Sequence, residues 1–293
     1  MERPKTHGIR ELPFEWVKSQ YAKKEEGSRF IEIDGIDLHY RDEGQGEPIL
    51  FMHGICDSLH TWTPWTNKLK DNYRVIRFDL PFFGLSRVHR KESITKEFYP
   101  AFLSKIVNHF GLSNFYLCGH SLGAWIAWNY AIKKQELLKK LILISPPGHP
   151  VKPPLLIRAT GHGLIKKLAS VYTPKFLADL AIKEIFYDPS FMTEYQRQRY
   201  YDILMIEGNR KNYMEVFSMM VKFSHEWPEG LNNITKETLV IWGRQDRWIP
   251  SSHSKYWERT LPNVKLDIFD KVGHVPQEES VDETLHSFLN FIK

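Results

Sequence analysis

The chain has 293 residues, of which 42% are hydrophobic and 26% are charged, values typical of a globular protein. The net charge is +5, and lysines and arginines are interleaved with acids along the sequence, so no basic stripe or reader motif predicts nucleic-acid binding. The sequence lacks an apolar run of about 18 residues, so no membrane span is predicted. Two cysteines exclude a disulfide framework. The N-terminus lacks the apolar core of a secretory signal, so we expect a cytoplasmic location.

The N-terminal part of the chain divides into two segments of different character. Residues 1–28 are mostly polar and charged around a few aromatics, and we expect them to form an N-terminal extension, with one helix. Residues 30–33 and 36–40 then alternate between apolar and polar on either side of Asp34-Gly35. A strand, a D-G turn and a second strand are the strongest short pattern for a β-hairpin.

Strands and helices alternate in the rest of the sequence, with one interruption. Apolar runs predict strands, and residues at helical spacing lie between several of them. The predicted strands are 49–52, 74–78, 115–118, 141–144, 238–242 and 265–269, and the predicted helices include 62–69, 95–110 and 251–260. This order predicts an α/β fold with a doubly wound, mostly parallel sheet.

The interruption begins at Ser145-Pro146-Pro147-Gly148. About ninety residues follow that read as helical. A helical insertion between two parallel strands lies over the carboxyl ends of the strands, where open α/β sheets bind ligands. We therefore expect a core domain of residues 29–146 and 237–293, with residues 147–236 inserted as a helical cap.

The segment Gly119-His120-Ser121-Leu122-Gly123 contains the candidate nucleophile. It follows the strand 115–118 directly and runs into a helical pattern, the context of a G-x-S-x-G elbow that exposes a serine at the edge of a sheet. At ordinary glycine usage, chance supplies such a pentapeptide in about one chain of ten. The prediction for Ser121 therefore depends on a base and an acid elsewhere in the chain.

A serine hydroxyl needs an adjacent base, and the base needs a carboxylate that fixes its tautomer. After an elbow of this type the partners follow in the order Ser, Asp or Glu, His. Asp246 lies four residues past the strand 238–242, and His274 lies just after the strand 265–269. Both fall at the carboxyl ends of their strands, so we predict a triad of Ser121, Asp246 and His274.

The negative charge that develops on the substrate oxygen needs two backbone N–H donors. Leu122 follows the nucleophile and begins a helix, whose N-terminal dipole favours a negative charge. The loop His53-Gly54-Ile55-Cys56 follows the strand 49–52, and Gly54 permits tight curvature there. We expect the N–H groups of Ile55 and Leu122 to form an oxyanion hole.

Several motifs together resemble the α/β-hydrolase superfamily: His53-Gly54, the pentapeptide 119–123, Trp242-Gly243-x-x-Asp246 and Gly273-His274. The resemblance runs from about residue 29 to the end, and it is closest to capped esterases and lipases whose elbow reads G-H-S-L-G or G-H-S-M-G. The segment 79–86 is similar to the family's D-x-P-G-x-G-x-S loop, but Phe82 stands where a glycine is common. The resemblance implies that Asp79 is structural.

The triad and the resemblance predict a serine hydrolase that cleaves carboxylic esters of apolar acyl or aromatic substrates through an acyl-enzyme. An apolar cap favours such substrates, although most of its apolar residues are expected to pack the cap onto the core: Phe186, Tyr187, Phe191, Met192, Leu204, Met205, Met214, Phe217, Met219, Met220 and Phe223.

Two alternatives stay open: hydrolysis of a C–C bond in a diketone-type substrate, and a non-catalytic ligand receptor on the same fold. We expect no cofactor and no metal, because the sequence has neither a phosphate loop nor a metal motif. The expected partner is a small apolar ester, and the oligomeric state is open.

Overall fold

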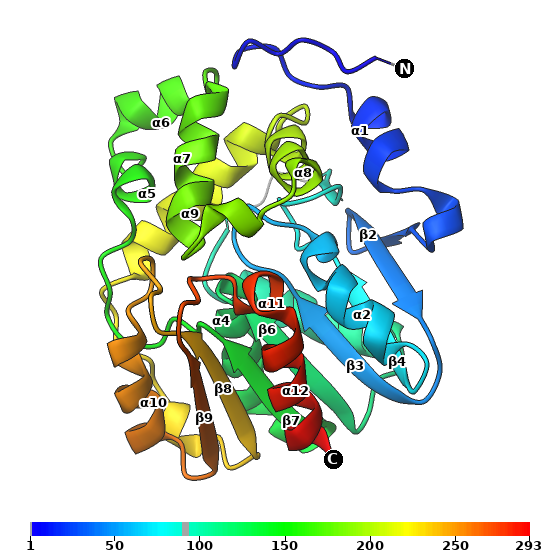
Figure 1. The fold of residues 1–293 in the computed structure, drawn as a ribbon, viewed down its shortest axis with the longest axis vertical. Helices are drawn as coiled ribbons and strands as arrows, with labels where there is room; N and C mark the ends of the chain where they lie inside the picture. The colour runs from blue at the N-terminus through cyan, green and yellow to red at the C-terminus, as the bar shows by residue number, and fades with distance from the viewer. Residues whose placement is uncertain (1, 90–93) are drawn as a thin grey trace.

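The computed structural model describes residues 2–89 and 94–293 (Figure 1). Within these residues a sheet has the strand order β1-β2-β4-β3-β6-β7-β8-β9, and β5 pairs with β2. The strands are β1 (Arg29–Ile33), β2 (Ile36–Glu43), β3 (Glu47–Met52), β4 (Tyr73–Phe78), β5 (Arg87–Val88), β6 (Phe115–His120), β7 (Leu138–Ile144), β8 (Thr238–Gly243) and β9 (Val264–Phe269). Neighbouring strands in the order β4-β3-β6-β7-β8-β9 are parallel. Strand β2 pairs antiparallel with β1, β4 and β5. The predicted α/β class is confirmed.

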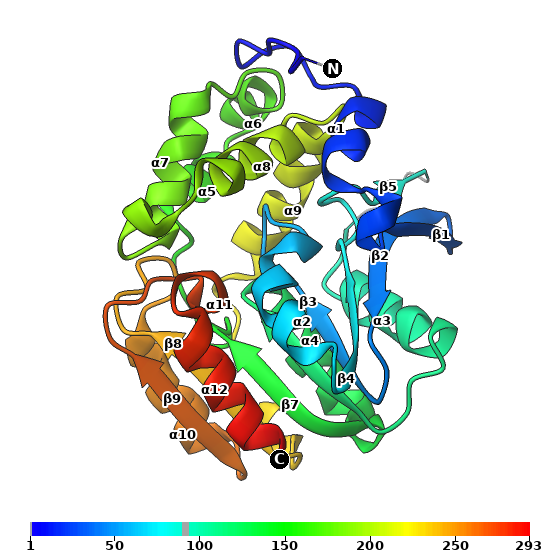
Figure 2. The same cartoon turned by 45° about the vertical axis from the view of Figure 1, so that its right-hand side comes forward.

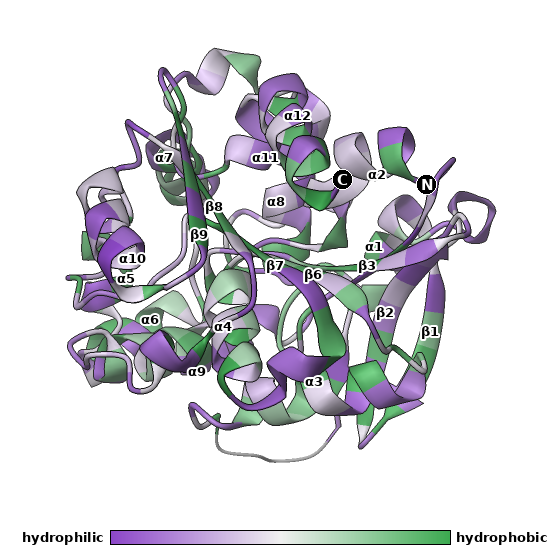
Figure 3. Ribbon diagram, turned by 90° about the horizontal axis from the view of Figure 1, so that it is seen from below, coloured by the Kyte–Doolittle hydropathy of each residue, from purple (hydrophilic) through white to green (hydrophobic). Residues whose placement is uncertain are grey.

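Helices cover both faces of the sheet (Figure 3). One apolar layer packs α2 and α12 against one face, and the other packs α3, α4 and α10 against the opposite face. The helices of the sheet region are α2 (Thr63–Leu69), α3 (Phe98–His109), α4 (Leu122–Lys134), α10 (Ser254–Thr260), α11 (Pro276–Glu279) and α12 (Val281–Ile292). Side chains alternate between the layers along each strand, as Ile142 and Leu143 do, because successive residues of a strand point to opposite faces. The central strands are therefore apolar on both sides.

The predicted hairpin is confirmed. Strands β1 and β2 pair through Ile33 and Ile36, and the two residues between them have positive φ values, 56° at Asp34 and 76° at Gly35. Two consecutive residues with positive φ characterise the type I′ turn, whose twist matches that of the flanking strands.

Five helices lie between β7 and β8, in the segment predicted to be an inserted cap. They are α5 (Leu155–Ala159), α6 (Gly163–Ala169), α7 (Lys175–Ile185), α8 (Glu194–Leu204) and α9 (Asn209–Phe223). Figures 1 and 2 place them together at one end of the sheet. No helix in residues 2–89 and 94–293 is long and apolar enough to cross a membrane.

The N-terminal segment is docked on these inserted helices. Its single α-helix, α1 (Phe14–Tyr21), lies beside α8, and an apolar cluster joins the two. The backbone of Leu12 donates to the Met205 carbonyl at 2.7 Å and accepts from the Glu207 N–H at 3.1 Å. The buried side chains of this segment are Leu12, Phe14, Trp16, Val17 and Tyr21. Although the segment is polar in composition, these five residues join one apolar cluster with residues of the inserted helices.

Candidate active site

Ser121 lies at a strained turn between β6 and α4. Its φ is 51° and its ψ is −114°, a conformation that an L-residue keeps only when its surroundings impose it. A Cβ atom on Gly119 would overlap the backbone of Gly123, and one on Gly123 would overlap the Met52 carbonyl. The two glycines of the pentapeptide therefore let the strand, the helix and β3 approach closely enough to form the elbow.

The structure brings Ser121, His274 and Asp246 together in one buried hydrogen-bonded chain. The Ser121 Oγ atom lies 3.0 Å from His274 Nε2, and His274 Nδ1 lies 2.8 Å from Asp246 Oδ2. Because a carboxylate accepts, Nδ1–H donates to Asp246, and Nε2 presents its lone pair to the Ser121 hydroxyl. This is the tautomer that a general base requires.

Asp246 is held by donors on every side. Its Oδ1 atom accepts from the N–H groups of Trp248 at 2.8 Å and Ile249 at 2.9 Å. Its Oδ2 atom accepts from the Trp242 indole at 3.2 Å in addition to His274. An ionised carboxylate is acceptor-only, so four donors match it and fix its orientation.

Two further glycines allow the loops that carry Asp246 and His274 to touch. A Cβ atom on Gly243 would overlap the Gly273 carbonyl, and one on Gly273 would lie 2.5 Å from the Ile185 carbonyl. The same Ile185 carbonyl accepts from the His274 N–H at 2.6 Å. His274 is thus held by the end of α7 as well as by its own loop.

The two expected oxyanion donors lie beside Ser121. Leu122 begins α4, and the first N–H groups of a helix have no partner within it. A Cβ atom on Gly54 would lie 3.2 Å from the Ser121 Cβ, so the Gly54-Ile55 peptide is adjacent to the serine. Ile55 and Leu122 also line the same cavity as Ser121 and His274.

His53 holds the peptide that contains the Ile55 N–H. Its Nε2 atom lies 2.8 Å from the Leu80 N–H, so Nε2 accepts, and Nδ1–H must donate to the Gly54 carbonyl at 2.7 Å. In a trans peptide the C=O and N–H groups point in opposite directions. The histidine therefore fixes the carbonyl on one side and directs the Ile55 N–H to the other. From the sequence, His53 was only the first residue of the loop expected to supply the Ile55 N–H.

Substituting His53 with leucine is expected to lower kcat about 100-fold and to change KM little. Without His53 the Ile55 N–H is misaligned, and its hydrogen bond to the oxyanion is made mainly in the transition state, so the loss affects kcat more than substrate binding. Steady-state kinetics on a p-nitrophenyl ester, with circular dichroism to verify folding, measure this. His53→Gln keeps a donor and should lose less. A folded His53→Leu protein with wild-type kcat would exclude this positioning role.

Three buried histidines predict loss of stability in acid. Burial lowers the pKa of His53 to about 4, and it also lowers the pKa values of His60 and His120. An unfolded histidine titrates near pH 6.5, so between about pH 6.5 and 4 the unfolded chain binds more protons. The free energy of unfolding should fall as the pH decreases through this window, by up to about 1.4 kcal/mol per pH unit for each histidine. Burial also raises the pKa values of Asp57 and Glu279, which opposes this trend, but the three histidines outnumber these two carboxyls. Urea unfolding at pH 7, 5.5 and 4.5 measures the effect, and a constant free energy of unfolding would contradict it.

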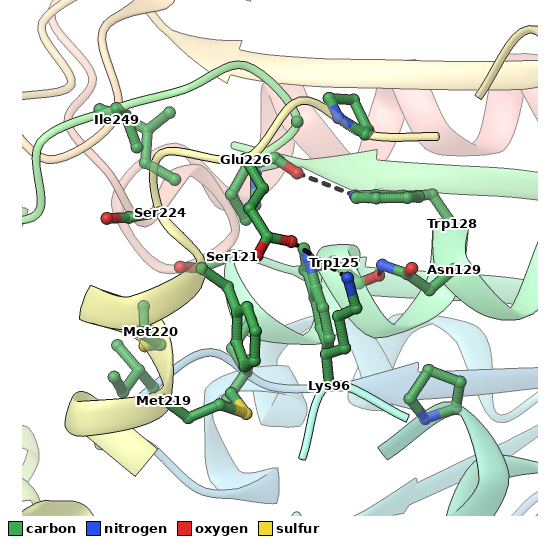
Figure 4. A pocket seen from close by; sticks show the side chains of 18 of the residues that line it. Lys96, Ser121, Trp125, Trp128, Asn129, Met219, Met220, Ser224, Glu226 and Ile249 are labelled. Carbon is green, nitrogen blue, oxygen red and sulfur yellow. Dashed lines mark hydrogen bonds and ion pairs between the residues drawn. The ribbon is translucent and has the colours of Figure 1, made fainter. Parts of the chain in front are cut away.

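A cavity of about 500 Å³ opens from Ser121 and lies between α4 and α9 (Figure 4). Its apolar lining includes Trp125, Trp128, Ile157, Met219, Met220, Phe223, Trp248 and Ile249. Figure 4 shows Trp125 and Trp128 projecting from α4, with Met219 and Met220 on α9. This lining suits an apolar ligand.

Of the eleven apolar cap residues considered from the sequence, only Met219, Met220 and Phe223 line this cavity. The others include Phe186 and Met205, which are buried in separate clusters, as expected for residues that pack the insertion. Trp125 and Trp128 of α4 were not among the residues expected to line a substrate site. Trp125 and Trp128 follow Ser121 by four and seven residues, a spacing that places them on the nucleophile's face of the helix.

Asp79 has the structural role implied by the resemblance. Its carboxylate accepts from the Leu59 N–H, the Leu85 N–H and His39, each at 2.7 Å. Phe82, which stands where related loops have a glycine, has a φ of 73°. The loop thus keeps the left-handed conformation that a glycine would adopt freely, and it does so at the cost of backbone strain.

The sheet order and the strand-to-helix elbow define the class of open α/β proteins with a serine at the carboxyl edge of the sheet. Residues 47–281 match the family model described as alpha/beta hydrolase fold, and the chain belongs to this family.

Similar proteins include a dienoate hydrolase and an esterase. The uncharacterized hydrolase YugF of Bacillus subtilis (strain 168) is 26% identical over 90% of this chain and 97% of its own length. The 2-hydroxy-6-oxo-6-phenylhexa-2,4-dienoate hydrolase of Comamonas testosteroni is 27% identical, covering 91% and 96%. Among solved structures, a thermophilic esterase from Thermogutta terrifontis has a TM-score of 0.76 at 23% identity, covering 90% and 97%. A putative lipase from Acinetobacter baumannii AYE has a TM-score of 0.80 at 22% identity, covering 96% of each chain. At these identities the structural likeness shows the fold.

Proposed function

We propose that the protein is a serine hydrolase that cleaves carboxylic esters with apolar acyl or aromatic groups. The observation that carries the proposal is the buried chain from Ser121 through His274 to Asp246, which opens into an apolar cavity. In this proposal the inserted helices act as a cap that selects the substrate.

Each residue of the site has a defined step. His274 Nε2 takes the Ser121 proton as Oγ attacks the ester carbonyl, and Asp246 stabilises the resulting imidazolium. The Ile55 and Leu122 N–H groups stabilise the oxyanion, a contribution of about 3 to 4 kcal/mol for each donor where one has been removed. His274 then protonates the leaving alcohol, and a water activated by the same histidine releases the acid from Ser121.

The charges around the cavity favour a neutral substrate. In the part of the chain that the structure describes, its lining cations are Lys96, Lys133 and Lys134. Lys96 pairs with Glu226 at 3.0 Å. Lys133 and Lys134 lie at the end of α4, roughly 18 Å along the helix from Ser121 at about 1.5 Å per residue. A carboxylate bound near the nucleophile would have none of these cations free to compensate its desolvation.

Hydrolysis of a C–C bond by the same triad is the second candidate. It is supported by the 27% identical dienoate hydrolase of Comamonas testosteroni, which covers 91% of this chain. A dienoate carries a carboxylate. Among the described residues the cavity offers no unpaired cation near Ser121, which is the reason that we place the ester first.

Turnover of p-nitrophenyl esters from C2 to C12, measured beside 2-hydroxy-6-oxo-6-phenylhexa-2,4-dienoate, separates these candidates. We expect ester turnover that increases with acyl length until the cavity is filled, and little or no dienoate cleavage. Preferred cleavage of the dienoate would favour C–C hydrolysis. If neither substrate is turned over although Ser121 reacts with a fluorophosphonate, the ester proposal fails and the receptor alternative gains.

A further inference from the structure

The first three inserted helices and the segments between them expose a concentration of large apolar side chains. Among the described residues, fourteen large hydrophobic side chains are well exposed, and nine of them fall between residues 155 and 180. We call these nine residues the cap face: Leu155, Leu156, Leu164, Ile165, Leu168, Val171, Tyr172, Phe176 and Leu180. Leu164 is 82% exposed, and α6 buries none of its side chains. Large apolar patches on a single chain mark interaction sites, whereas scattered single residues do not.

Helices α5, α6 and α7 carry the cap face and lie together, away from the sheet (Figures 1 and 2). Each of these helices is short, and none of them spans the molecule. The exposed leucines of α6 alternate with lysines, as in Leu164-Ile165-Lys166-Lys167-Leu168. An apolar face flanked by basic residues is typical of helices that lie in the plane of a membrane interface.

The basic charge of the protein is concentrated in the same segment. From residue 152 to residue 183 there are six lysines and arginines and one acid, Asp179, which accounts for the entire net charge of +5. The remaining residues contain 34 basic and 34 acidic side chains. The even interleaving expected from the sequence is therefore wrong for this segment.

Some of these cations are paired within the chain and others are not. Lys175 pairs with Asp179 at 2.9 Å, and Lys166 pairs with Glu215 at 3.0 Å. Within residues 2–89 and 94–293, Arg158 and Lys167 have no ion pair, and both are exposed. A surface that combines leucines with unpaired cations is complementary to anionic lipid headgroups above an apolar layer.

The start of α5 joins the cap face to the cavity. Pro153, Pro154 and Ile157 line the cavity, whereas Leu155 and Leu156, between them in sequence, are exposed to solvent. One helical turn thus forms the wall of the cavity on one side and part of the cap face on the other.

We propose that the cap face docks on the surface of an anionic lipid bilayer, beside the cavity that receives the substrate. The cap-face side chains enter the interface, and the free cations contact the headgroups. A second copy of the chain fits this surface less well, because two segments of equal positive charge would face each other. Docking is independent of the proposed ester hydrolysis. Only the further step, in which an ester enters the cavity from the bilayer, rests on the proposed function.

Flotation with vesicles of equal parts phosphatidylcholine and phosphatidylglycerol tests the docking. We expect the wild-type protein to float with these vesicles, to float weakly with phosphatidylcholine alone, and to dissociate at 1 M salt, where the Debye length falls to about 3 Å. The variant Leu164→Ser/Leu168→Ser/Phe176→Ser should not float. The variant Arg158→Glu/Lys167→Glu should bind the anionic vesicles at least about 20-fold more weakly, because each cation near the surface contributes about 5-fold.

Two variants serve as matched controls. Phe191→Ser removes an exposed aromatic outside the cap face, and Lys255→Glu reverses an exposed charge on α10; both should float like the wild type. All variants should retain the circular dichroism spectrum and the thermal unfolding temperature of the wild type, which shows that the fold is intact whether or not the protein cleaves esters.

Three outcomes would overturn the docking proposal: a wild-type protein that does not float with the anionic vesicles, a triple serine variant that floats as well as the wild type, or a concentration-dependent dimer that the triple variant abolishes in the absence of vesicle binding. A protein that floats but cleaves no ester would contradict only the proposed function.

Discussion

Replacing Asp246 with asparagine is expected to lower kcat by about 10⁴-fold while leaving the fold intact. The Oδ1 atom would still accept from Trp248 and Ile249, so the loop keeps its shape. An amide NH₂ at the position of Oδ2 would face the Trp242 indole N–H and His274 Nδ1. His274 must then accept at Nδ1 and carry its proton on Nε2, where it cannot take the Ser121 proton.

The matched control is Asp270→Asn. Asp270 is exposed, pairs with the exposed Arg244, and should leave kcat unchanged. Kinetics on the best p-nitrophenyl ester, together with thermal unfolding of both variants, make the comparison. If Asp246→Asn keeps more than a tenth of wild-type kcat, Asp246 does not fix the tautomer of His274.

Replacing Arg199 with methionine is expected to destabilise the protein by about 3 to 5 kcal/mol. Arg199 lies on α8 with 4% of its side chain exposed, and it faces two buried carboxylates, Glu278 at 3.1 Å and Asp57 at 3.6 Å. Burial and the neighbouring charge of Glu278 raise the pKa of Asp57, so the two carboxylates already repel each other. Without Arg199, no other cation in residues 2–89 and 94–293 forms an ion pair with either carboxylate.

The destabilisation should increase with pH, because a buried carboxyl with a raised pKa favours folding in acid and loses that contribution as it ionises. Urea unfolding at pH 6 and pH 8 measures the trend. Arg244→Met removes an exposed arginine that also pairs with an aspartate, and it should change stability by less than about 1 kcal/mol. The double variant Arg199→Met/Glu278→Met should recover part of the loss. Equal stability of Arg199→Met and Arg244→Met would show that the buried network contributes nothing.

The parts of the fold that depend on local patterns could be predicted from the sequence. Alternation and the D-G turn predicted the β1–β2 hairpin, and apolar runs predicted the parallel strands. The elbow context, with the order of Asp246 and His274 along the chain, selected three residues that the structure brings into one hydrogen-bonded chain. The carboxyl ends of parallel strands meet at one edge of the sheet. Residues that follow different strands can therefore be predicted to lie close together from their positions in the sequence.

Contacts between distant segments could not be predicted from a single sequence. The pairing of Arg199 with Asp57 joins positions 142 residues apart, and no local pattern marks either residue as buried. The docking of Leu12 on Met205 depends on how the inserted helices are oriented. Single charges read along the sequence also gave no indication that α5, α6 and α7 would present one basic, apolar face.

The most direct test of the account is the mass of the intact protein after reaction with a fluorophosphonate. Our account predicts one adduct on the wild-type protein, mapped by peptide sequencing to Ser121, and no adduct on Ser121→Ala. His274→Ala should react far more slowly, because the serine then has no base. Equal labelling of Ser121→Ala and the wild type, or an adduct on another residue, would contradict Ser121 as the nucleophile.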